Sequence, residues 1–361
     1  MVTEISPEGG SHGLTEEGLV HIPGFLSRWV RLASGARAHY MTAGDTGPAV
    51  ILLHGGINGS SGTAGWRFMA PFLGANGFRV FCPDQPGFGL ADTREEFWPQ
   101  EGTLSHIEFV KEFADALCLD KFHLSGNSMG CGNSVQFIQR YPERVISFAL
   151  IAGGWADLAD PAKRITGKDG KFTPNPSYNR PPWDGTEQSM RELMEGIIFK
   201  QGVIWPELIK MRNDAALRQK ESFEALSAGR ENVINDPNLR QKTTGKGRFD
   251  SMTLPGINLY GKQDVLSPVE NGFAQDEMGL KNIQCFFPDQ CGHQGQSDQP
   301  EMFQQVFLEW FRYGKVSKET AEWAGASDRT PVKATHIDLE GNVVPKDVIA
   351  IKGEISPGVK V

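Results

Sequence analysis

The chain is predicted to adopt an α/β fold, in which a mostly parallel sheet is covered by helices on both faces. Short apolar runs alternate with amphipathic helical patterns along most of the sequence, and such alternation is typical of parallel sheets. Residues 154–248 interrupt the alternation once and carry no strand pattern. A G-x-S-x-G pentapeptide at residues 126–130 joins a short apolar run to a helical pattern.

The bulk composition is that of a globular protein. The chain has 361 residues, of which 39% are hydrophobic and 22% charged, enough for one large domain with an insertion. Its net charge of −8 provides no basic surface for nucleic acid. No apolar run is long enough to span a membrane, and the first ten residues lack a signal-peptide pattern. We therefore expect a cytoplasmic protein whose partner is a small-molecule substrate.

The cysteines favour reduced thiols over a disulfide framework. There are five, an odd number, and they are widely spread along the chain. Cys285, Cys291 and His293 lie close in sequence, but no C-x-x-C pair accompanies them, so we expect no metal. No cofactor is predicted either.

The expected elements follow from periodicity and turn residues. Strands are predicted at residues 29–32, 36–42, 49–53, 79–82, 122–124, 145–151, 256–260 and 283–287. Core helices are predicted at residues 105–119, from the pentapeptide to about residue 141, and at residues 300–312. Ser105 and Glu108 form a capping-box pattern at the start of the first of these helices.

The sequence divides into four parts. Residues 1–24 are predicted to be a loose N-terminal arm, and residues 25–153 and 251–315 to form the α/β core. Residues 154–250 are predicted to be a helical cap inserted over the sheet, with helices at 187–199, 206–220 and 222–232. Residues 316–361 are predicted to be a polar C-terminal tail, with a small hairpin about Gly341. The tail either lies over its own core or crosses a neighbouring subunit, so a homodimer is left open.

The pentapeptide predicts a nucleophile elbow, a tight strand-to-helix turn that presents the hydroxyl of Ser128. Side chains two residues either side of the serine would collide in so sharp a turn. Gly126 and Gly130 carry none.

A serine hydroxyl needs a base to take its proton, and the base needs an acid to orient it. The expected chain order is Ser, then Asp or Glu, then His. His293 follows the last predicted strand and precedes the last helix, so it is the predicted base. Asp264 follows the preceding strand and is the predicted acid, with Asp289 as the competing candidate. His123 lies inside a strand and is interpreted as structural.

A tetrahedral intermediate requires two backbone N–H donors. The amide of Met129 is one candidate, because it follows the nucleophile at a helix N-terminus. The second is predicted in the loop after residue 53, at Gly56. Gly55 and Gly56 also allow the backbone to approach a bound ligand closely.

These residues resemble the α/β-hydrolase fold over residues 25–153 and 251–315. Within that fold they are most similar to the meta-cleavage product hydrolases, which cleave C–C bonds in vinylogous 1,5-diketones made by ring-opening dioxygenases. The motifs that carry the resemblance are His54-Gly55-Gly56 followed by Gly65-Trp66, Asp84-Gln85-Pro86-Gly87-Phe88-Gly89, Gly126-Asn127-Ser128-Met129-Gly130 and Cys291-Gly292-His293.

The resemblance also implies substrate-binding residues. Arg212, in Met211-Arg212-Asn213-Asp214, corresponds to an arginine that binds the substrate carboxylate; the alternative is a solvated helix charge. Asn127 and Gln294 flank the nucleophile and the base, and Trp155 belongs to a tryptophan-rich cap that suits an aromatic substrate or is plain core.

The departures from the family fall where substrate is held. Gln294 replaces the usual Trp after the catalytic His, and Arg67 and Phe68 follow Trp66 where the family has a polar Asn. Cys131 replaces the glycine after the elbow and is interpreted as a small packing residue. These changes leave the triad intact and the substrate open.

The predicted function is that of a capped serine hydrolase, with C–C cleavage favoured. An esterase or lactonase acting on an aromatic or polycyclic ester is the alternative, because the same triad serves both reactions. A slow-turnover ligand receptor and a cofactorless oxygenase are further alternatives. Haloalkane dehalogenases and epoxide hydrolases are disfavoured, since their nucleophile is Asp where this chain has Ser128.

Overall fold

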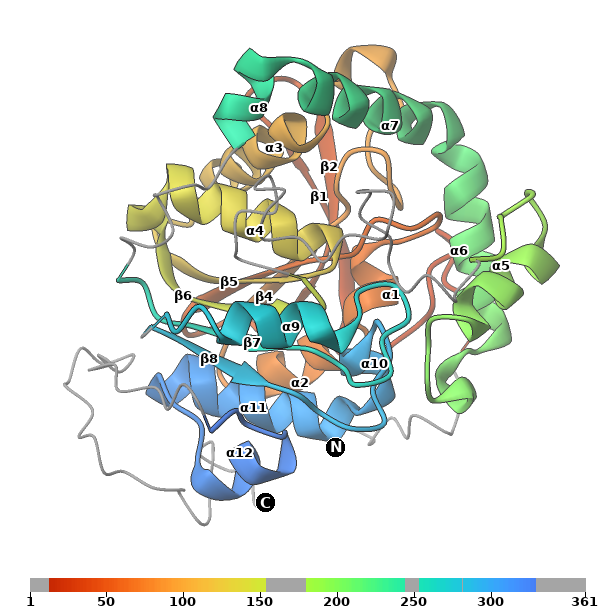
Figure 1. The fold of residues 1–361 in the computed structure, drawn as a ribbon. Helices are drawn as coiled ribbons and strands as arrows, with labels where there is room; N and C mark the ends of the chain where they lie inside the picture. Colours follow the sequence, from red (N-terminus) through yellow and green to blue (C-terminus); the bar gives the residue numbers. More distant parts are fainter. Residues whose placement is uncertain (1–12, 154–179, 244–252, 281, 329–361) are drawn as a thin grey trace.

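A computed structural model of the chain describes residues 13–153, 180–243, 253–280 and 282–328 (Figure 1). Its centre is an eight-stranded sheet with the order β1-β2-β4-β3-β5-β6-β7-β8. The antiparallel pairs are β1 with β2 and β2 with β4, and every other neighbouring pair is parallel. The strands are β1 (Leu26–Arg31), β2 (Arg37–Ala43), β3 (Ala49–Leu53), β4 (Arg79–Pro83), β5 (Phe122–Asn127), β6 (Val145–Ile151), β7 (Gly256–Leu259) and β8 (Ile283–Phe286).

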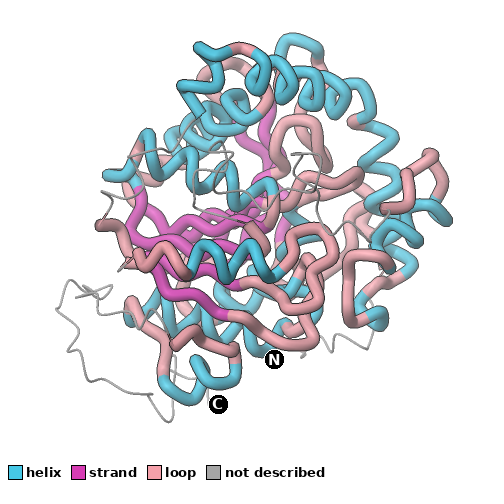
Figure 2. The backbone as a smooth tube through the Cα atoms, in the orientation of Figure 1, coloured by secondary structure: helices cyan, strands magenta, loops and turns pink. Residues whose placement is uncertain are grey.

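Helices cover both faces of the sheet, as Figure 2 shows. The helices are α1 (Gly62–Trp66), α2 (Met69–Ala75), α3 (Thr103–Ala116), α4 (Met129–Arg140), α5 (Glu187–Glu195), α6 (Pro206–Arg218), α7 (Lys220–Asn235), α8 (Pro237–Thr243), α9 (Val269–Asp276), α10 (Gly295–Asp298), α11 (Pro300–Tyr313) and α12 (Lys318–Trp323). Alternate residues of β3 point to opposite faces: Val50 and Leu52 pack with α2 and α11, whereas Ile51 and Leu53 pack with α3 and α4. The predicted fold class is confirmed.

The predicted capping box is wrong. Helix α3 begins at Thr103, and Gly102, with φ +60°, occupies the N-cap position without a side-chain bond. The hydroxyl of Ser105 lies inside the first turn and accepts the backbone N–H of Glu101 at 3.0 Å. A Cβ at Gly102 would lie 2.8 Å from the backbone nitrogen of Arg230 on α7. The close approach of α7 thus requires glycine where the helix starts.

The N-terminal arm is not loose where the structure describes it. Leu19, Val20 and Ile22 are buried in the core cluster, and Leu14 forms an isolated antiparallel bridge with Val20. The backbone N–H of Val20 also donates to the sulfur of Met211 on α6, at 3.3 Å. Burial in the core cluster and this bond to α6 therefore hold the segment.

The folded core also continues past Lys315, where the sequence predicts a polar tail. Helix α12 follows, and Ala324 is fully buried. The carboxylate of Glu309 on α11 accepts the hydroxyl hydrogens of Ser317 and Thr320. Ala326 then forms a bridge with Phe286 of the edge strand β8. The hairpin predicted about Gly341 lies outside the described residues.

Between β6 and β7 the described residues 180–243 form helices and connecting turns, with no strand. In Figure 1 helix α7 lies beside α3, α8 follows and contacts α7, and α5 lies beside α6. The division into core, cap and tail stays a prediction. Every helix in the described part of the chain is too short or too polar to cross a membrane.

Candidate active site

Ser128 lies in a strained turn between β5 and α4. Its φ of +56° and ψ of −114° are unusual for a residue with a side chain. A Cβ on Gly126 would lie 2.1 Å from the backbone of Gly130, and one on Gly130 would lie 2.3 Å from the carbonyl oxygen of Leu53. Only glycine permits this approach of β5, α4 and the end of β3. The local backbone is therefore that of a nucleophile elbow.

His293 and Asp264 form a buried pair after β8 and β7. The Nδ1 atom of His293 lies 2.8 Å from Oδ2 and 3.0 Å from Oδ1 of Asp264, and both residues are at most 5% exposed. Oδ1 of Asp264 also accepts the backbone N–H groups of Leu266 and Ser267, each at 2.8 Å. Because Nδ1 donates to the carboxylate, Nε2 is the nitrogen that can take a proton. Asp289, the competing candidate, binds Gln263 instead, at 2.6 Å.

The backbone around His293 is held by three further groups. Its N–H donates to the carbonyl of Ile197 at 3.0 Å, and its carbonyl accepts the side-chain amide of Asn127 at 3.0 Å. The carboxylate of Asp298 accepts the N–H groups of Gly292 at 2.7 Å and of Lys200 at 2.8 Å. Burial raises the pKa of Asp298 to about 6.

Sequence reasoning missed Asp298 entirely. Its one signal is its position just before the predicted helix at residues 300–312, since acids commonly occupy helix N-termini. Asn127, predicted to bind substrate, directs its amide to the His293 loop in this structure.

The loop after β3 lies against the elbow. A Cβ on Gly56 would lie 2.8 Å from both Cβ and Sδ of Met129, and one on Gly55 would lie 3.5 Å from Cβ of Ser128. The structure thus places Gly55 and Gly56 beside Ser128 and Met129. A side chain on Gly56 would collide with Met129, so glycine is required for the two segments to meet.

Arg212 is buried, so the alternative of a solvated helix charge is wrong. The residue is 1% exposed on α6. Its Nη2 atom donates to the carbonyl of Asn58 at 3.2 Å and lies 3.5 Å from the hydroxyl of Ser60, while its Nε has no partner within the described structure. Burial lowers the pKa of Arg212 to about 10, which still leaves it charged at neutral pH. Among the described residues no carboxylate pairs with it.

Arg67 is a second buried cation, which sequence reasoning noted only as a departure from the family. It donates to the carbonyls of Ala64 at 2.7 Å and Val203 at 3.0 Å. Its guanidinium carbon lies 4.4 Å from the ring centroid of Phe68 and 5.1 Å from that of Trp205. Burial, and to a smaller extent the charge of Arg212, lowers the pKa of Arg67 to about 9.

The remaining predicted residues are placed as follows. Gln294 is buried at the N-cap of α10, and its carbonyl accepts the N–H of Ser297 at 2.7 Å. Trp155 lies outside the described residues. His123 is buried in β5 and bonded to the hydroxyl of Ser147 at 2.8 Å, as expected of a structural histidine. Cys131 is fully buried, as expected of a packing residue. The described residues contain no cluster of three metal-ligating side chains.

Known proteins are similar to this chain in sequence and in fold. The profile of the alpha/beta hydrolase fold family matches residues 48–179. The chain is 27% identical to 2-hydroxy-6-oxononadienedioate/2-hydroxy-6-oxononatrienedioate hydrolase 1 of Pseudomonas putida, over 80% of this chain and 97% of that protein. It is 28% identical to 2-hydroxy-6-oxo-6-phenylhexa-2,4-dienoate hydrolase of Comamonas testosteroni, over 76% of this chain and 91% of that protein.

The fold is also similar to solved structures. The meta-cleavage product hydrolase of Pseudomonas fluorescens IP01 superposes with a TM-score of 0.61 at 23% identity, covering 79% of this chain and 97% of that one. A serine hydrolase from Cycloclasticus zankles gives a TM-score of 0.65 at 20% identity, covering 80% and 98%. The predicted resemblance is confirmed: the chain has the α/β-hydrolase fold and is similar to the meta-cleavage product hydrolases.

Proposed function

We propose that the chain is a capped serine hydrolase that cleaves a C–C bond in a ring-cleavage product of aromatic catabolism. Ser128 is the nucleophile, His293 the general base and acid, and Asp264 the residue that orients His293. The backbone N–H groups of Gly56 and Met129 form the oxyanion hole. The substrate is a small molecule, and a cytoplasmic location is part of the proposal.

The observation that carries the proposal is the buried His293–Asp264 pair, in a chain that also holds Ser128 at the strained position of an elbow. A carboxylate at Nδ1 fixes the imidazole tautomer and stabilises the imidazolium that forms when Ser128 loses its proton. The positive φ of Ser128 is strain of the kind found at functional sites. Packing alone does not explain why a buried His–Asp pair and a strained serine occur in the same chain.

The chemistry divides into two stages. The dienol substrate is first converted to its keto form. The oxygen of Ser128 then adds to the ketone carbon, and His293 takes the hydroxyl proton. The C–C bond breaks, its electron pair leaves with the dienolate carbon, and His293 returns the proton to that carbon. Water, activated by His293, hydrolyses the ester left on Ser128, so an acid is released and the serine is restored.

The buried Arg212 favours the C–C reaction. One named relative acts on a nonadienedioate and a nonatrienedioate, and the other on a phenylhexadienoate, and each of these substrates carries at least one carboxylate. A guanidinium with an unpartnered Nε is suited to bind such a group. Burial strengthens this attraction because little water competes for the charge. We therefore propose that Arg212 binds the substrate carboxylate.

The second candidate is an ester or lactone hydrolase. Phe68 packs edge-to-face on Trp205, with ring centroids 5.5 Å apart, where the family has a polar residue after the Trp. An apolar surface here fits an aromatic or polycyclic ester. Such a substrate requires only acylation of Ser128 and hydrolysis of the acyl-enzyme.

Steady-state turnover separates the candidates. The first assay follows loss of visible absorbance of 2-hydroxy-6-oxo-6-phenylhexa-2,4-dienoate, with an aryl ester in parallel. We expect rapid loss of the dienoate colour, abolished in Ser128→Ala and reduced by about 10³-fold or more in His293→Ala, because triad members act as a unit. Ester cleavage without dienoate cleavage supports the second candidate. Stoichiometric binding without turnover by the wild type indicates a receptor and contradicts both.

A further inference from the structure

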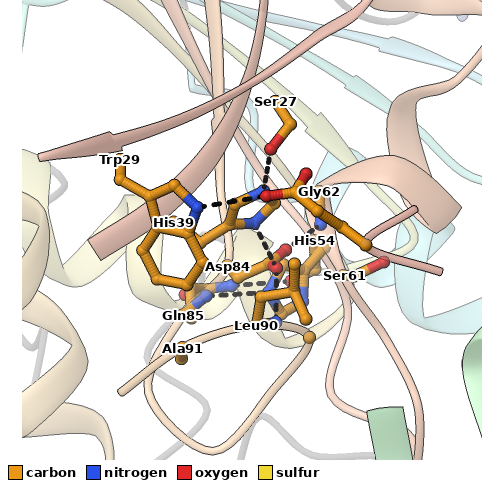
Figure 3. A network of polar contacts seen from close by, with 12 residues as sticks. Ser27, Trp29, His39, His54, Ser61, Gly62, Asp84, Gln85, Leu90 and Ala91 are labelled. Atoms are coloured by element: carbon orange, nitrogen blue, oxygen red, sulfur yellow. Dashed lines mark hydrogen bonds and ion pairs between the residues drawn. The ribbon is translucent and has the colours of Figure 1, made fainter. Parts of the chain in front are cut away.

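A network of buried polar side chains contacts the backbone of Gly55 in the loop after β3. Figure 3 shows His54 and Gln85 within it, next to the buried His39–Asp84 pair. The backbone N–H of Gln85 donates to Nε2 of His54 at 3.0 Å, and the side-chain amide of Gln85 donates to the carbonyl of His54, also at 3.0 Å. The Nδ1 atom of His54 lies 2.7 Å from the carbonyl oxygen of Gly55.

These contacts determine which nitrogen of His54 carries the hydrogen. A backbone N–H can only donate, so Nε2, which faces the N–H of Gln85, must present its lone pair. A neutral imidazole with a lone pair on Nε2 carries its hydrogen on Nδ1. Nδ1 therefore donates to the carbonyl of Gly55, which can only accept. Burial lowers the pKa of His54, as does the charge of Arg212 to a smaller extent, against the opposing charge of Asp84; the neutral form is thus favoured.

The bond to the Gly55 carbonyl has a consequence for the next amide. The carbonyl of Gly55 and the N–H of Gly56 belong to one planar trans peptide, in which they point in opposite directions. A group that holds the carbonyl therefore also sets the direction of the N–H. With no side chain on either residue, this peptide would otherwise rotate easily.

We propose that His54 is a positioning residue for the oxyanion hole, because its Nδ1–H holds the Gly55 carbonyl and so directs the Gly56 N–H towards the substrate. The inference rests on the proposed function, in which Gly56 supplies one of the two oxyanion donors. Nothing in the reaction requires His54 to touch the substrate or exchange a proton.

The same network extends to the helix that supplies the second donor. The side-chain amide of Asn133 donates to Oε1 of Gln85 at 2.6 Å and to Nδ1 of His106 at 3.0 Å. Nε2 of His106 donates in turn to the carbonyl of Pro86 at 2.9 Å. Asn133 lies on α4 one turn after Met129, on the same side of the helix. One buried network thus connects the loop of Gly56 to the helix of Met129.

Replacing His54 with Asn or with Gln tests the roles of its two ring nitrogens separately. In His54→Asn the side-chain amide can stand where Nδ1–H stood and still donate to Gly55, whereas in His54→Gln it reaches towards Gln85 and leaves the Gly55 carbonyl without its donor. We expect His54→Gln to lower kcat by about 100-fold with KM nearly unchanged, the usual effect of losing one oxyanion donor. His54→Asn should recover most of that loss.

A matched control is available in His123, another fully buried histidine with a bonded Nδ1, in β5 at the far end from Ser128. His123→Gln and His123→Asn should leave kcat unchanged and match each other. The pH profile of kcat/KM for His54→Gln should have the same shape and midpoints as that of the wild type. A shifted limb would mean that the triad, rather than the oxyanion hole, has moved, and would overturn the proposal.

Two measurements keep the inference separate from the proposed function. The imidazole ¹⁵N spectrum of the wild type should show His54 as the Nδ1–H tautomer; the Nε2–H tautomer overturns the proposal even if the variants fail to fold. An aryl boronic acid, whose tetrahedral adduct with Ser128 presents an oxygen to the hole, should bind about 100-fold more weakly to His54→Gln and normally to His54→Asn. If His54→Gln and His54→Asn bind the boronic acid equally well, the proposal for His54 is overturned.

A wild type that turns over neither the dienoate nor the ester refutes the proposed function alone. The ¹⁵N spectrum and the boronic acid affinities still decide the role of His54 in that case.

Discussion

The carboxylate of Asp298 accepts the backbone N–H of Gly292 at 2.7 Å, one residue before His293. Its other oxygen accepts the N–H of Lys200 at 2.8 Å, in the segment that follows α5. The N–H of His293 itself bonds to the carbonyl of Ile197. The helical stretch after β6 and the loop of the proposed base are therefore held together by backbone bonds and one buried carboxylate.

We expect Asp298→Asn to lower both stability and kcat. An amide presents one oxygen and one NH₂ group, so one of the two backbone N–H groups would face another donor. Leaving a buried donor unsatisfied costs about 1–3 kcal/mol, which urea denaturation can measure at about pH 4, where Asp298 contributes most to stability. Asp289 is an exposed carboxylate in the same loop region. The matched control Asp289→Asn should change neither the free energy of unfolding nor kcat appreciably. Full activity in Asp298→Asn would show that the His293 loop is held by its other bonds alone.

The free energy of unfolding should change with pH as Asp298 titrates. Burial raises its pKa from 3.8 to about 6, so between these values the folded state binds more protons than the unfolded state. Its contribution to stability is then fully present below pH about 4 and is lost as pH rises through about 6, a loss of about 3 kcal/mol. The free energy of unfolding of the wild type, relative to that of Asp298→Asn, should therefore fall by this amount between pH 4 and 7. A constant difference would contradict the raised pKa.

Arg212→Ala should discriminate between acidic and neutral substrates. A hydrogen-bonded charge pair contributes about 1.5–3 kcal/mol, so KM for the phenyl dienoate should rise by roughly 10- to 100-fold. KM for a neutral aryl ester should change far less, and this substrate serves as the internal control for loss of packing. Lys210→Ala, on the exposed side of the same helix, controls for removal of a positive charge. Equal increases for both substrates would exclude a carboxylate-binding role.

Gly126→Ala should destroy the elbow. Its Cβ would lie 2.1 Å from the backbone of Gly130, and no flexible side chain is available to move aside. We expect loss of activity and a stability decrease at the upper end of single mutations, above about 3 kcal/mol. Gly132→Ala, on the helix α4 that follows the elbow, has open space around the new methyl group. It should be neutral or stabilise the chain by up to about 1 kcal/mol through helix propensity; similar losses in both variants would contradict the steric argument.

Much of the fold was predictable because its signals are local. The strands at residues 49–53 and 145–151 match β3 and β6 exactly, since strands buried on both faces are continuous apolar runs. The elbow was predictable because the steric demand for Gly126 and Gly130 arises within five residues of chain. The order Ser128, Asp264, His293 also identified the pair that the structure brings together.

The sequence by itself therefore determined the fold class, the elbow and the candidate triad, because periodicity and turn sterics depend on neighbouring residues. Only the tertiary structure decided which polar groups are buried and what they meet. Asp298 bonds a residue 98 positions away, and Arg67 one 136 positions away. The role of His54 depends on the approach of Gln85, 31 residues later. The partner of a buried charge or imidazole is set by how distant segments pack, and no local pattern encodes that packing.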